Sequence, residues 1–432
     1  MAAGELCTLS AVQAIRLIRE GRITCEALVR DCIARIDARE EVVQAWVVID
    51  REAAIARARE LDRLGTPAGI LHGLPVGVKD VFDTFDFPTG NGSPIYDGWR
   101  SRADAACVAA ARAAGAIILG KTHTAEFANL HPPPTRNPNN PAYTPGGSSS
   151  GSAAAVADFM VPLAFGTQTG GSTVRPSSFC GIVGFKPSFG EISRSGLKLS
   201  AESLDTVGLF GREVADVALF AHALYGLDID ASAQTAPRVG LFRTSRWGRV
   251  QPAMRAAIEE AAQRFAKAGA TLVELSVDAD FESLFLAHAL IMRYEIARSM
   301  VWETEHHRER YSAIFRERVE AGMKTTRAEW CEALAVCERW RRWFAQALKD
   351  FDVLLTPSAA GPAPEGLSST GDSSFNGIWT ALGLPCLNLP HTKDASGLPL
   401  GIQLVAGAHA DASLLRAASW LESALRRDEL SR

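Results

Sequence analysis

The chain has 432 residues, 47% of them hydrophobic and 22% charged, which is typical of a globular protein with a large core. A net charge of −4 without any Lys/Arg block argues against a nucleic-acid partner. No apolar run reaches the roughly 18 residues of a membrane span, and the N-terminus lacks the pattern of a signal peptide. We therefore expect a cytoplasmic protein that does not bind membranes.

The first predicted element is a helical N-terminal layer over residues 1–65, because apolar residues such as Ile15, Ile18, Leu28, Cys32 and Ile36 recur at helical spacing from residue 8 onward. The predicted catalytic core, residues 66–210, follows. It begins with a short apolar strand at 76–78. A helix over 104–114, with Asp104 as its N-cap, and a strand over 116–119 come next.

Two glycine-serine clusters dominate the stretch from 144 to 190, at residues 146–152 and 170–172. The small apolar residues and strand-like run between them exclude a flexible linker, which would be polar throughout. Glycine permits close backbone approach to a substrate, and a serine hydroxyl becomes a nucleophile when a base lies beside it. We therefore expect an active site built from two loops, with its base elsewhere in the chain.

The remaining elements alternate between helix and strand, apart from a loop expected at 203–211. We expect a helix at 213–225, a strand-helix-strand unit at 239–242, 252–268 and 271–277, a helical segment at 283–350, strands at 353–355, 381–389 and 400–405, and a final helix at 412–425. The apolar stripe Leu334, Cys337, Trp340, Phe344 and Leu348 within the helical segment favours core packing. This order predicts an α/β fold with a large mixed, largely parallel sheet flanked by helices on both faces.

Three other kinds of site are weakly indicated. Residues 115–122 match GxxxxGK[ST], but the intervening Ala-Ile-Ile-Leu resembles a strand and not a phosphate-binding loop. The eight scattered cysteines form no CxxC pair, and we expect reduced, mostly buried thiols. His306 and His307 lack metal-ligand spacing and suit a solvated helix face. His72, His123 and His131 leave a Ser-His-Asp hydrolase as a minor alternative, without the GxSxG elbow.

The remaining candidate base is Lys79, at the end of the first short strand. Free lysine has a pKa of about 10.4, so a lysine base active at neutral pH needs a fall of about 3 units. Burial lowers the pKa of a lysine in this way. Taken alone, Lys79 also suits a surface or ion-paired position, because lysine is rarely fully buried.

Read together, GLPVGVKD at 73–80, GGSSSGSAAAVA at 146–157 and GTQTGGSTVRPSSFCGIVGFKPS at 166–188 resemble the amidase signature family. The likeness covers nearly the whole chain, including SLDTVG at 203–208 and GLPLGIQLVAG at 397–407. It implies the amidase signature fold as a single domain over 1–432. It also implies hydrolysis of a carboxamide without metal or cofactor, and a homodimer.

The resemblance also implies roles for individual residues. Lys79 matches the family's base, Ser148 the relay serine that follows a cis peptide bond, and Ser172 the nucleophile. The backbone N–H groups of Thr169, Gly170, Gly171 and Ser172 match the oxyanion hole, and we expect substrate contacts from Gly147, Ser149 and Arg175. Asp205 and Arg194 are interpreted as structural supports of the serine loops.

Two positions depart from the commonest family pattern. Gln168 stands where many members have Asp, and Arg175 lies one residue later than the usual arginine. The later arginine resembles the malonamidase-like subgroup, where it holds a substrate carboxylate; a structural ion pair is the equally weighted alternative. We therefore predict an amidase acting on a small amide, with an amide that bears a carboxylate as the preferred substrate and segment 283–350 shaping the pocket. The alternatives are an amidotransferase subunit that delivers ammonia in a tRNA-charging complex, and a hydrolase of carboxybiuret- or allophanate-type urea derivatives.

Overall fold

A sheet of 11 strands organises the computed structural model, which describes residues 5–228 and 235–429. The strand order is β1-β3-β2-β4-β6-β5-β10-β11-β9-β7-β8. The strands are β1 (Trp46–Ile49), β2 (Pro75–Lys79), β3 (Ile117–Thr122), β4 (Leu163–Gln168), β5 (Val183–Lys186), β6 (Thr206–Gly211), β7 (Arg238–Leu241), β8 (Thr271–Glu274), β9 (Val353–Pro357), β10 (Cys386–Lys393) and β11 (Pro399–Val405).

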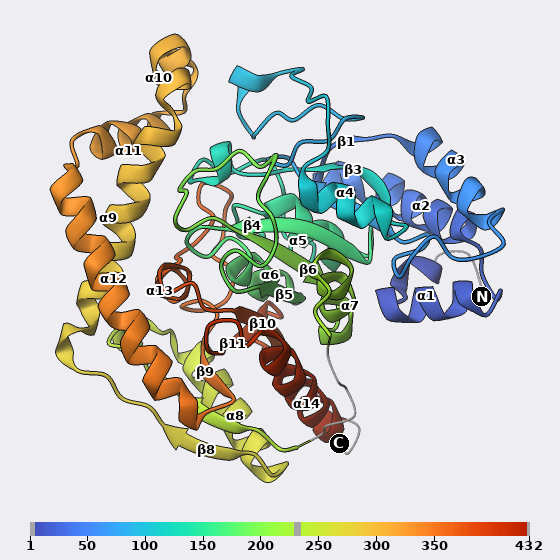
Figure 1. The fold of residues 1–432 in the computed structure, drawn as a ribbon. Helices are drawn as coiled ribbons and strands as arrows, with labels where there is room; N and C mark the ends of the chain where they lie inside the picture. The colour runs from blue at the N-terminus through green and yellow to red at the C-terminus, as the bar shows by residue number, and fades with distance from the viewer. Residues whose placement is uncertain (1–4, 229–234, 430–432) are drawn as a thin grey trace.

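Helices cover both faces of this sheet (Figure 1). They are α1 (Ala11–Arg19), α2 (Cys25–Val43), α3 (Arg51–Asp62), α4 (Ala106–Ala113), α5 (Ser150–Ala157), α6 (Val174–Cys180), α7 (Val214–Tyr225), α8 (Pro252–Lys267), α9 (Glu282–Ser299), α10 (Val301–His307), α11 (Ala313–Met323), α12 (Arg327–Ala347), α13 (Gly377–Ala381) and α14 (Asp411–Glu429). No helix within the described residues is long and apolar enough to cross a membrane.

The sheet is mixed, as predicted, but the expectation that it is largely parallel is wrong, because its parallel pairs form only two groups and most pairs are antiparallel. Strands β3, β2 and β4 are parallel neighbours, and so are β9, β7 and β8. The strands between these groups, from β4 to β9 in the sheet order, pair antiparallel. Helices α4, α5 and α8 provide the crossovers that parallel pairs require, whereas β10 and β11 are joined by a short hairpin that only an antiparallel pair permits.

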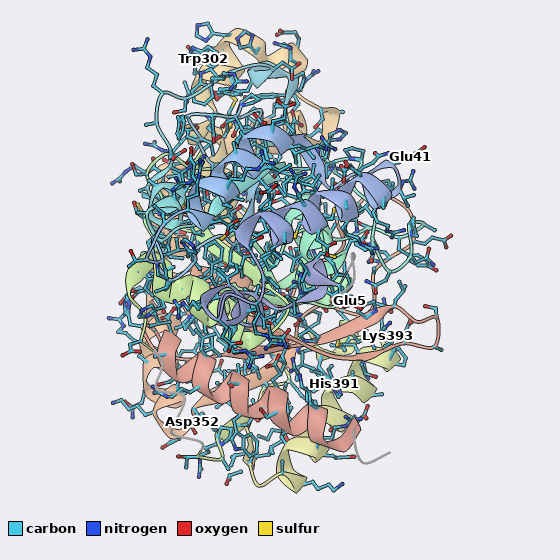
Figure 2. The ribbon with its side chains drawn as sticks, turned by 90° about the vertical axis from the view of Figure 1, so that its right-hand side faces the viewer. Glu5, Glu41, Trp302, Asp352, His391 and Lys393 are labelled. Atoms are coloured by element: carbon cyan, nitrogen blue, oxygen red, sulfur yellow. The ribbon has the colours of Figure 1, made fainter. Side chains whose placement is uncertain are left out.

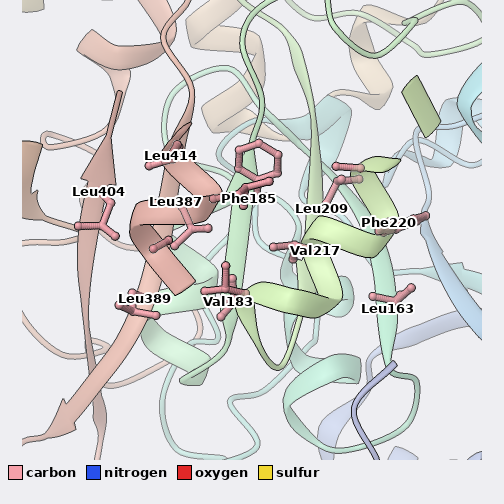
Figure 3. Close-up of a cluster of buried hydrophobic side chains, with 14 of the residues drawn as sticks. Leu163, Val183, Phe185, Leu209, Val217, Phe220, Leu387, Leu389, Leu404 and Leu414 are labelled. Atoms are coloured by element: carbon pink, nitrogen blue, oxygen red, sulfur yellow. The ribbon is translucent and has the colours of Figure 1, made fainter. Parts of the chain in front are cut away.

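The hydrophobic core fills both sides of the sheet. Figure 3 shows side chains of β4, β5, β6, β10 and β11 meeting α7 and α14 on one side. On the opposite side, one cluster joins α2, α3 and α5 to the sheet, and another joins α9, α12 and α13 to it. The successive strand residues Val353, Leu354 and Leu355 show the alternation, because Leu354 packs with α12 and its two neighbours pack on the other side. The serine loops therefore lie between large buried layers.

Three local predictions are wrong. Residues 46–49 form strand β1 within the expected helical layer, because Trp-Val-Val-Ile favours a strand and pairs with β3. Residues 206–211 form buried strand β6 and not a loop. Its Gly208 is required by packing, since a Cβ there would overlap the Thr173 side chain. Asp104 is not an N-cap: its carboxylate accepts a hydrogen bond from Phe85 N at 3.1 Å, and the helix begins after Ala105.

The expected helical segment contains four helices, which form a layer beside the sheet (Figure 1). The stripe of α12 packs into the core as predicted: Cys337, Trp340 and Phe344 are buried against Phe242, Phe281 and Trp379. At the other end of this layer, Trp302 of α10 is 51% exposed and marks one tip of the molecule (Figure 2). The layer therefore has one end in the core and the other at the surface.

Candidate active site

The candidate site forms where β2 and β4 run side by side and the N-termini of α5 and α6 approach them. Val78 of β2 is paired with Phe165 of β4, so the ends of the two strands lie at neighbouring levels. The first serine loop leads into α5, and the second connects β4 to α6. This topology brings the motif at 73–80 together with both glycine-serine clusters, as the two-loop hypothesis requires.

Lys79 lies at the bottom of the site and is fully buried. Its Nζ is 2.8 Å from Ser148 Oγ and 2.6 Å from Thr167 Oγ1. Burial lowers the pKa of Lys79 to about 7, and the Asp205 carboxylate opposes that shift. This is the fall that a lysine base needs, and the surface interpretation of Lys79 is wrong.

Ser148 is the buried partner of this lysine, and its peptide bond with Gly147 is cis. The hydroxyl of Ser149, in contrast, is used within the protein. It donates to Thr167 O and accepts from Thr167 N, both at 3.2 Å, and the residue is fully buried. This hydroxyl connects the first serine loop to β4, and a substrate contact from Ser149 stays a prediction.

Ser172 retains 7% of its exposure, while Lys79 and Ser148 retain none. Within the described residues, its hydroxyl has no hydrogen-bond partner, so the structure joins Lys79 to Ser148 but not Ser148 to Ser172. The backbone N–H groups of residues 169–172 also lack an acceptor in this part of the chain. Ser172, which has the most accessible hydroxyl of the site, thus follows three residues whose N–H groups, like its own, have no acceptor in the described chain.

The second serine loop is held from its sides. The Thr169 hydroxyl donates to the Asp205 carboxylate, which also accepts from Ser200 N at 2.6 Å and Ala201 N at 3.0 Å. Arg194 donates to the carbonyl of Asp205 at 3.3 Å. On the other side, a Cβ at Gly171 would overlap the Asn376 side-chain amide. The structure places Asp205 and Arg194 as loop supports, as expected.

Gln168, which stands in place of the commoner Asp, forms hydrogen bonds through both ends of its side-chain amide. Its Oε1 accepts from the backbone N–H groups of Thr173 and Val174, both at 3.1 Å, where α6 begins. Its Nε2 donates to Thr380 Oγ1 at 3.2 Å. The helix that carries Arg175 is therefore capped by a neutral amide and not by a carboxylate.

Arg175 is buried beside the first serine loop. Its guanidinium donates to Gly147 O at 2.6 Å and to Thr370 Oγ1 at 3.1 Å, while its Nε has no partner. Burial lowers the pKa of Arg175 to about 10, which leaves it charged at neutral pH, and Asp372 opposes the shift. No carboxylate of the described chain lies within ion-pair distance of it, so the expected structural ion pair is not present.

The GxxxxGK[ST] match is a strand, as its apolar residues predicted. Ile117–Thr122 is β3, and Lys121 lies buried inside the protein. The Lys121 Nζ contacts Phe82 O at 2.8 Å, Thr89 Oγ1 at 2.8 Å and Asp80 Oδ1 at 3.0 Å. This lysine stabilises the chain after β2 and cannot reach a nucleotide.

The candidate histidines do not form a serine-histidine pair. His72 Nδ1 accepts from Ala68 N at 2.9 Å, and burial lowers the pKa of His123 to about 4. His306 contacts Trp302 O at 2.8 Å on the exposed tip. Across the described residues, no group of three or more His, Cys, Asp or Glu side chains is placed to hold a metal ion. All eight cysteines are free, and seven are buried.

Two residues at the site have no counterpart in the sequence-based prediction. Thr167 contacts Lys79, and His288 of α9 lies 2.9 Å from Thr169 O through its Nε2. Thr167 stands in the same motif as the oxyanion residues, so its proximity to the lysine follows once the β2–β4 register is known. His288 is separated from that motif by more than a hundred residues, and the sequence contains no signal for the contact.

Comparison with known proteins identifies the relatives of this chain. It is 34% identical to a glutamyl-tRNA(Gln) amidotransferase subunit of Anaeromyxobacter sp. (strain K), over 98% of this chain and 97% of that protein. Its structure matches a crystal structure of an amidase with a TM-score of 0.89 and 32% identity, covering 96% of this chain and 100% of that one. It also matches the native peptide amidase of Stenotrophomonas maltophilia with a TM-score of 0.85 and 26% identity, over 98% of both chains. The family model described as Amidase matches residues 27–415, and the chain therefore belongs to the amidase family.

Proposed function

We propose that this protein hydrolyses a small carboxamide to a carboxylate and ammonia or an amine, with Ser172 as nucleophile. The observation that carries the proposal is the buried Lys79 amine, whose pKa is lowered to about 7 and whose Nζ lies 2.8 Å from Ser148 Oγ. A serine hydroxyl is a poor nucleophile until a neighbour accepts its proton. Lys79 and Ser148 together supply that neighbour.

In the first half of the reaction, neutral Lys79 accepts the Ser148 proton while Ser148 accepts the proton of Ser172. Ser172 Oγ then bonds to the carbonyl carbon of the amide. The carbonyl oxygen becomes negative and accepts from the free N–H groups of residues 169–172. Rotation of the Ser172 side chain closes its gap to Ser148, since catalytic hydrogen bonds often tighten only with substrate bound.

In the second half, the proton on Lys79 returns through Ser148 to the leaving nitrogen, and the C–N bond breaks. The product acid is then esterified to Ser172. Water loses a proton to the same serine-lysine relay and attacks the ester carbonyl, which releases the carboxylate and restores Ser172. No redox step is involved, and the base is neutral again at the end.

A fluorophosphonate probe tests this assignment, because Ser172 Oγ displaces its fluoride and keeps the phosphonyl group. We expect mass spectrometry to find the added mass on the peptide that contains Ser172, and no labelling of Ser172→Ala. Labelling at another serine, or an active enzyme that resists the probe, would contradict the proposal.

For the substrate class, we propose an amide that carries its own carboxylate, held by Arg175. Support comes from a buried charged guanidinium without a carboxylate partner in the described chain and with an unpaired Nε. Arg175→Ala should lose more activity on acid-bearing amides than on neutral amides of equal size. Equal losses would assign Arg175 to supporting Gly147 O, which it contacts at 2.6 Å.

Two further candidates remain within the family. The curated relatives favour an amidotransferase subunit, since proteins 30% and 34% identical to this chain bear that name. Amide hydrolysis by the purified chain alone would exclude an obligate complex. The second candidate is an allophanate-type hydrolase. A panel containing malonamate, neutral aliphatic and aromatic amides, and carboxylated urea derivatives distinguishes the proposed amidase from it.

A further inference from the structure

We infer that His288 is a positioning residue for the oxyanion loop, residues 169–172. From the distant helix α9, it fixes the orientation of the Thr169–Gly170 peptide. The inference rests on the proposed function, since it assigns the loop its catalytic task. The contact is single and specific: His288 Nε2 lies 2.9 Å from Thr169 O, and the histidine is buried. A carbonyl oxygen only accepts, so Nε2 carries the donated hydrogen.

The direction of one carbonyl determines the direction of the next N–H. In a planar trans peptide, the C=O of Thr169 and the N–H of Gly170 point in opposite directions. Because the carbonyl is bound to His288 on α9, the Gly170 N–H points away from α9. That N–H has no acceptor within the described residues, as an oxyanion donor requires before substrate binds.

The loop needs this anchor because its own residues do not restrict the peptide. Gly170 has no side chain, so rotation of the Thr169–Gly170 peptide meets a low barrier. A hypothetical Cβ on Gly170 would find its nearest neighbours only at 3.6 Å, at Ser373 Oγ, and at 3.9 Å, at the His288 ring. A flipped peptide would direct a carbonyl oxygen at the developing oxyanion. His288 disfavours the flip, because a flipped Thr169 carbonyl would lose its hydrogen bond to the His288 ring.

The other loop contacts do not perform this task. Asp205 holds the Thr169 side chain, and the Asn376 amide packs beside Gly171. Neither contacts the carbonyl of Thr169. The His288 ring is itself fixed by packing, since a Cβ on Gly377 would overlap it at 2.5 Å. Burial lowers the pKa of His288 to about 4, so the ring is neutral at neutral pH.

The test measures how fast a fluorophosphonate inactivates Ser172, resolved into the maximal rate kinact and the half-saturating concentration KI. His288→Phe keeps a flat aromatic ring but removes the donor, and we expect kinact to fall about 10- to 100-fold with KI within about twofold. His288→Gln can place an amide N–H near the Nε2 position, and should retain kinact within about fivefold of wild type. Both variants should keep the wild-type pH inflection, because Lys79 is unaffected.

His391→Phe is the matched control, because its side chain is also buried but lies beside Glu260 of α8, in the half of the molecule opposite Trp302 (Figure 2). We expect wild-type kinact from it. If His288→Phe does not fold, His288→Asn replaces it, since its shorter amide cannot reach Thr169 O. Normal kinact in His288→Phe or in its replacement His288→Asn, or equal losses in His288→Gln and His288→Phe, would overturn the inference alone. Failure of the wild type to be labelled at Ser172 would overturn the proposed function and the inference with it.

Discussion

Two buried lysines stand at neighbouring places in the sheet, yet their surroundings differ in kind. Lys79 ends β2, and Lys121 lies in the adjacent strand β3, paired with Val78. Both are fully buried, and burial lowers the pKa of each. Lys121 lies 3.0 Å from the Asp80 carboxylate and also contacts two carbonyl oxygens and a hydroxyl. Within the described residues, the Lys79 Nζ hydrogen-bonds only to the hydroxyls of Ser148 and Thr167.

This difference separates a structural lysine from the proposed base. Carboxylate and carbonyl oxygens only accept, so the three such partners of Lys121 favour an ammonium group with three N–H donors. A hydroxyl can donate as well as accept, so Ser148 remains a satisfied partner whether Lys79 carries its third proton or not. The comparison teaches that burial alone does not make a lysine a base. Its neighbours must also tolerate the neutral amine.

The largest expected effect separates the two lysines directly. Lys79→Met should lower the rate of amide hydrolysis about 10⁴-fold, because general-base assistance contributes up to about that factor. Lys121→Met should instead lower the free energy of unfolding by about 3–5 kcal/mol, since it leaves Asp80 buried and unpaired. Folded Lys121→Met should still be labelled at Ser172. Near-normal turnover by Lys79→Met, measured alongside thermal unfolding of both variants, would remove the base from the mechanism.

The adjacent serines extend the comparison to the partners of Lys79. Ser148→Ala removes the relay hydroxyl and should lower the rate about 10³-fold with little loss of stability. Ser149→Ala removes the two hydrogen bonds to the Thr167 backbone, and should cost about 1–3 kcal/mol of unfolding free energy. Urea titration and turnover of the two variants check this contrast. A Ser149→Ala variant that is stable but inactive would contradict the structural role of Ser149 and assign it a part in catalysis.

The pH profile reports the state of Lys79 itself. Below its pKa of about 7 the amine is protonated and cannot accept a proton, so activity should fall about tenfold per pH unit as pH decreases. Above that pH the rate should reach a plateau. Labelling rates of Ser172 between pH 5 and pH 9, at about constant ionic strength, measure the inflection. A rate that is independent of pH across this range would contradict a lysine base.

The smallest effect compares the threonines beside each lysine. Thr167→Val removes a hydroxyl that accepts from Lys79, so the ammonium form loses support and the pKa of Lys79 should fall further, by less than about one unit. The inflection should move to lower pH. Thr89→Val removes a partner of Lys121 and should cost about 1 kcal/mol of stability without moving the inflection. An upward shift in Thr167→Val would contradict the hydrogen-bond direction.

Much of the site could be predicted because its residues stand in short motifs. The motif around Lys79 and the two serine clusters identify the family, and the structure brings Lys79 and Ser148 into contact. The cis peptide before Ser148 was likewise expected from the resemblance. The roles of Ser172 and of the N–H groups at 169–172 remain predictions for the labelling experiments.

What the sequence did not indicate depends on register and distant packing. Ser149 resembles Ser148 in the chain, but successive residues point to different neighbours, and only one of these hydroxyls faces Lys79. The glycines of strand β6 weaken its strand signal in the sequence, so the pattern favours a loop. Gly208 is nevertheless needed there, because a Cβ at this position would overlap the Thr173 side chain. His288 reaches the site because α9 packs on the loop, and no local pattern specifies such a contact.

The register of β2 has a consequence for insertions and deletions. Val76 and Val78 point into the core on one face of the sheet, while Gly77 faces Trp46 and Ala164 on the other. Lys79 shares the parity of Gly77, which brings its amine to the first serine loop. Loss or gain of one residue within β2 would exchange the two faces. The protein would then keep every residue of the family motifs and still be inactive. We therefore expect the length of this strand to matter to activity as much as the identity of the lysine itself.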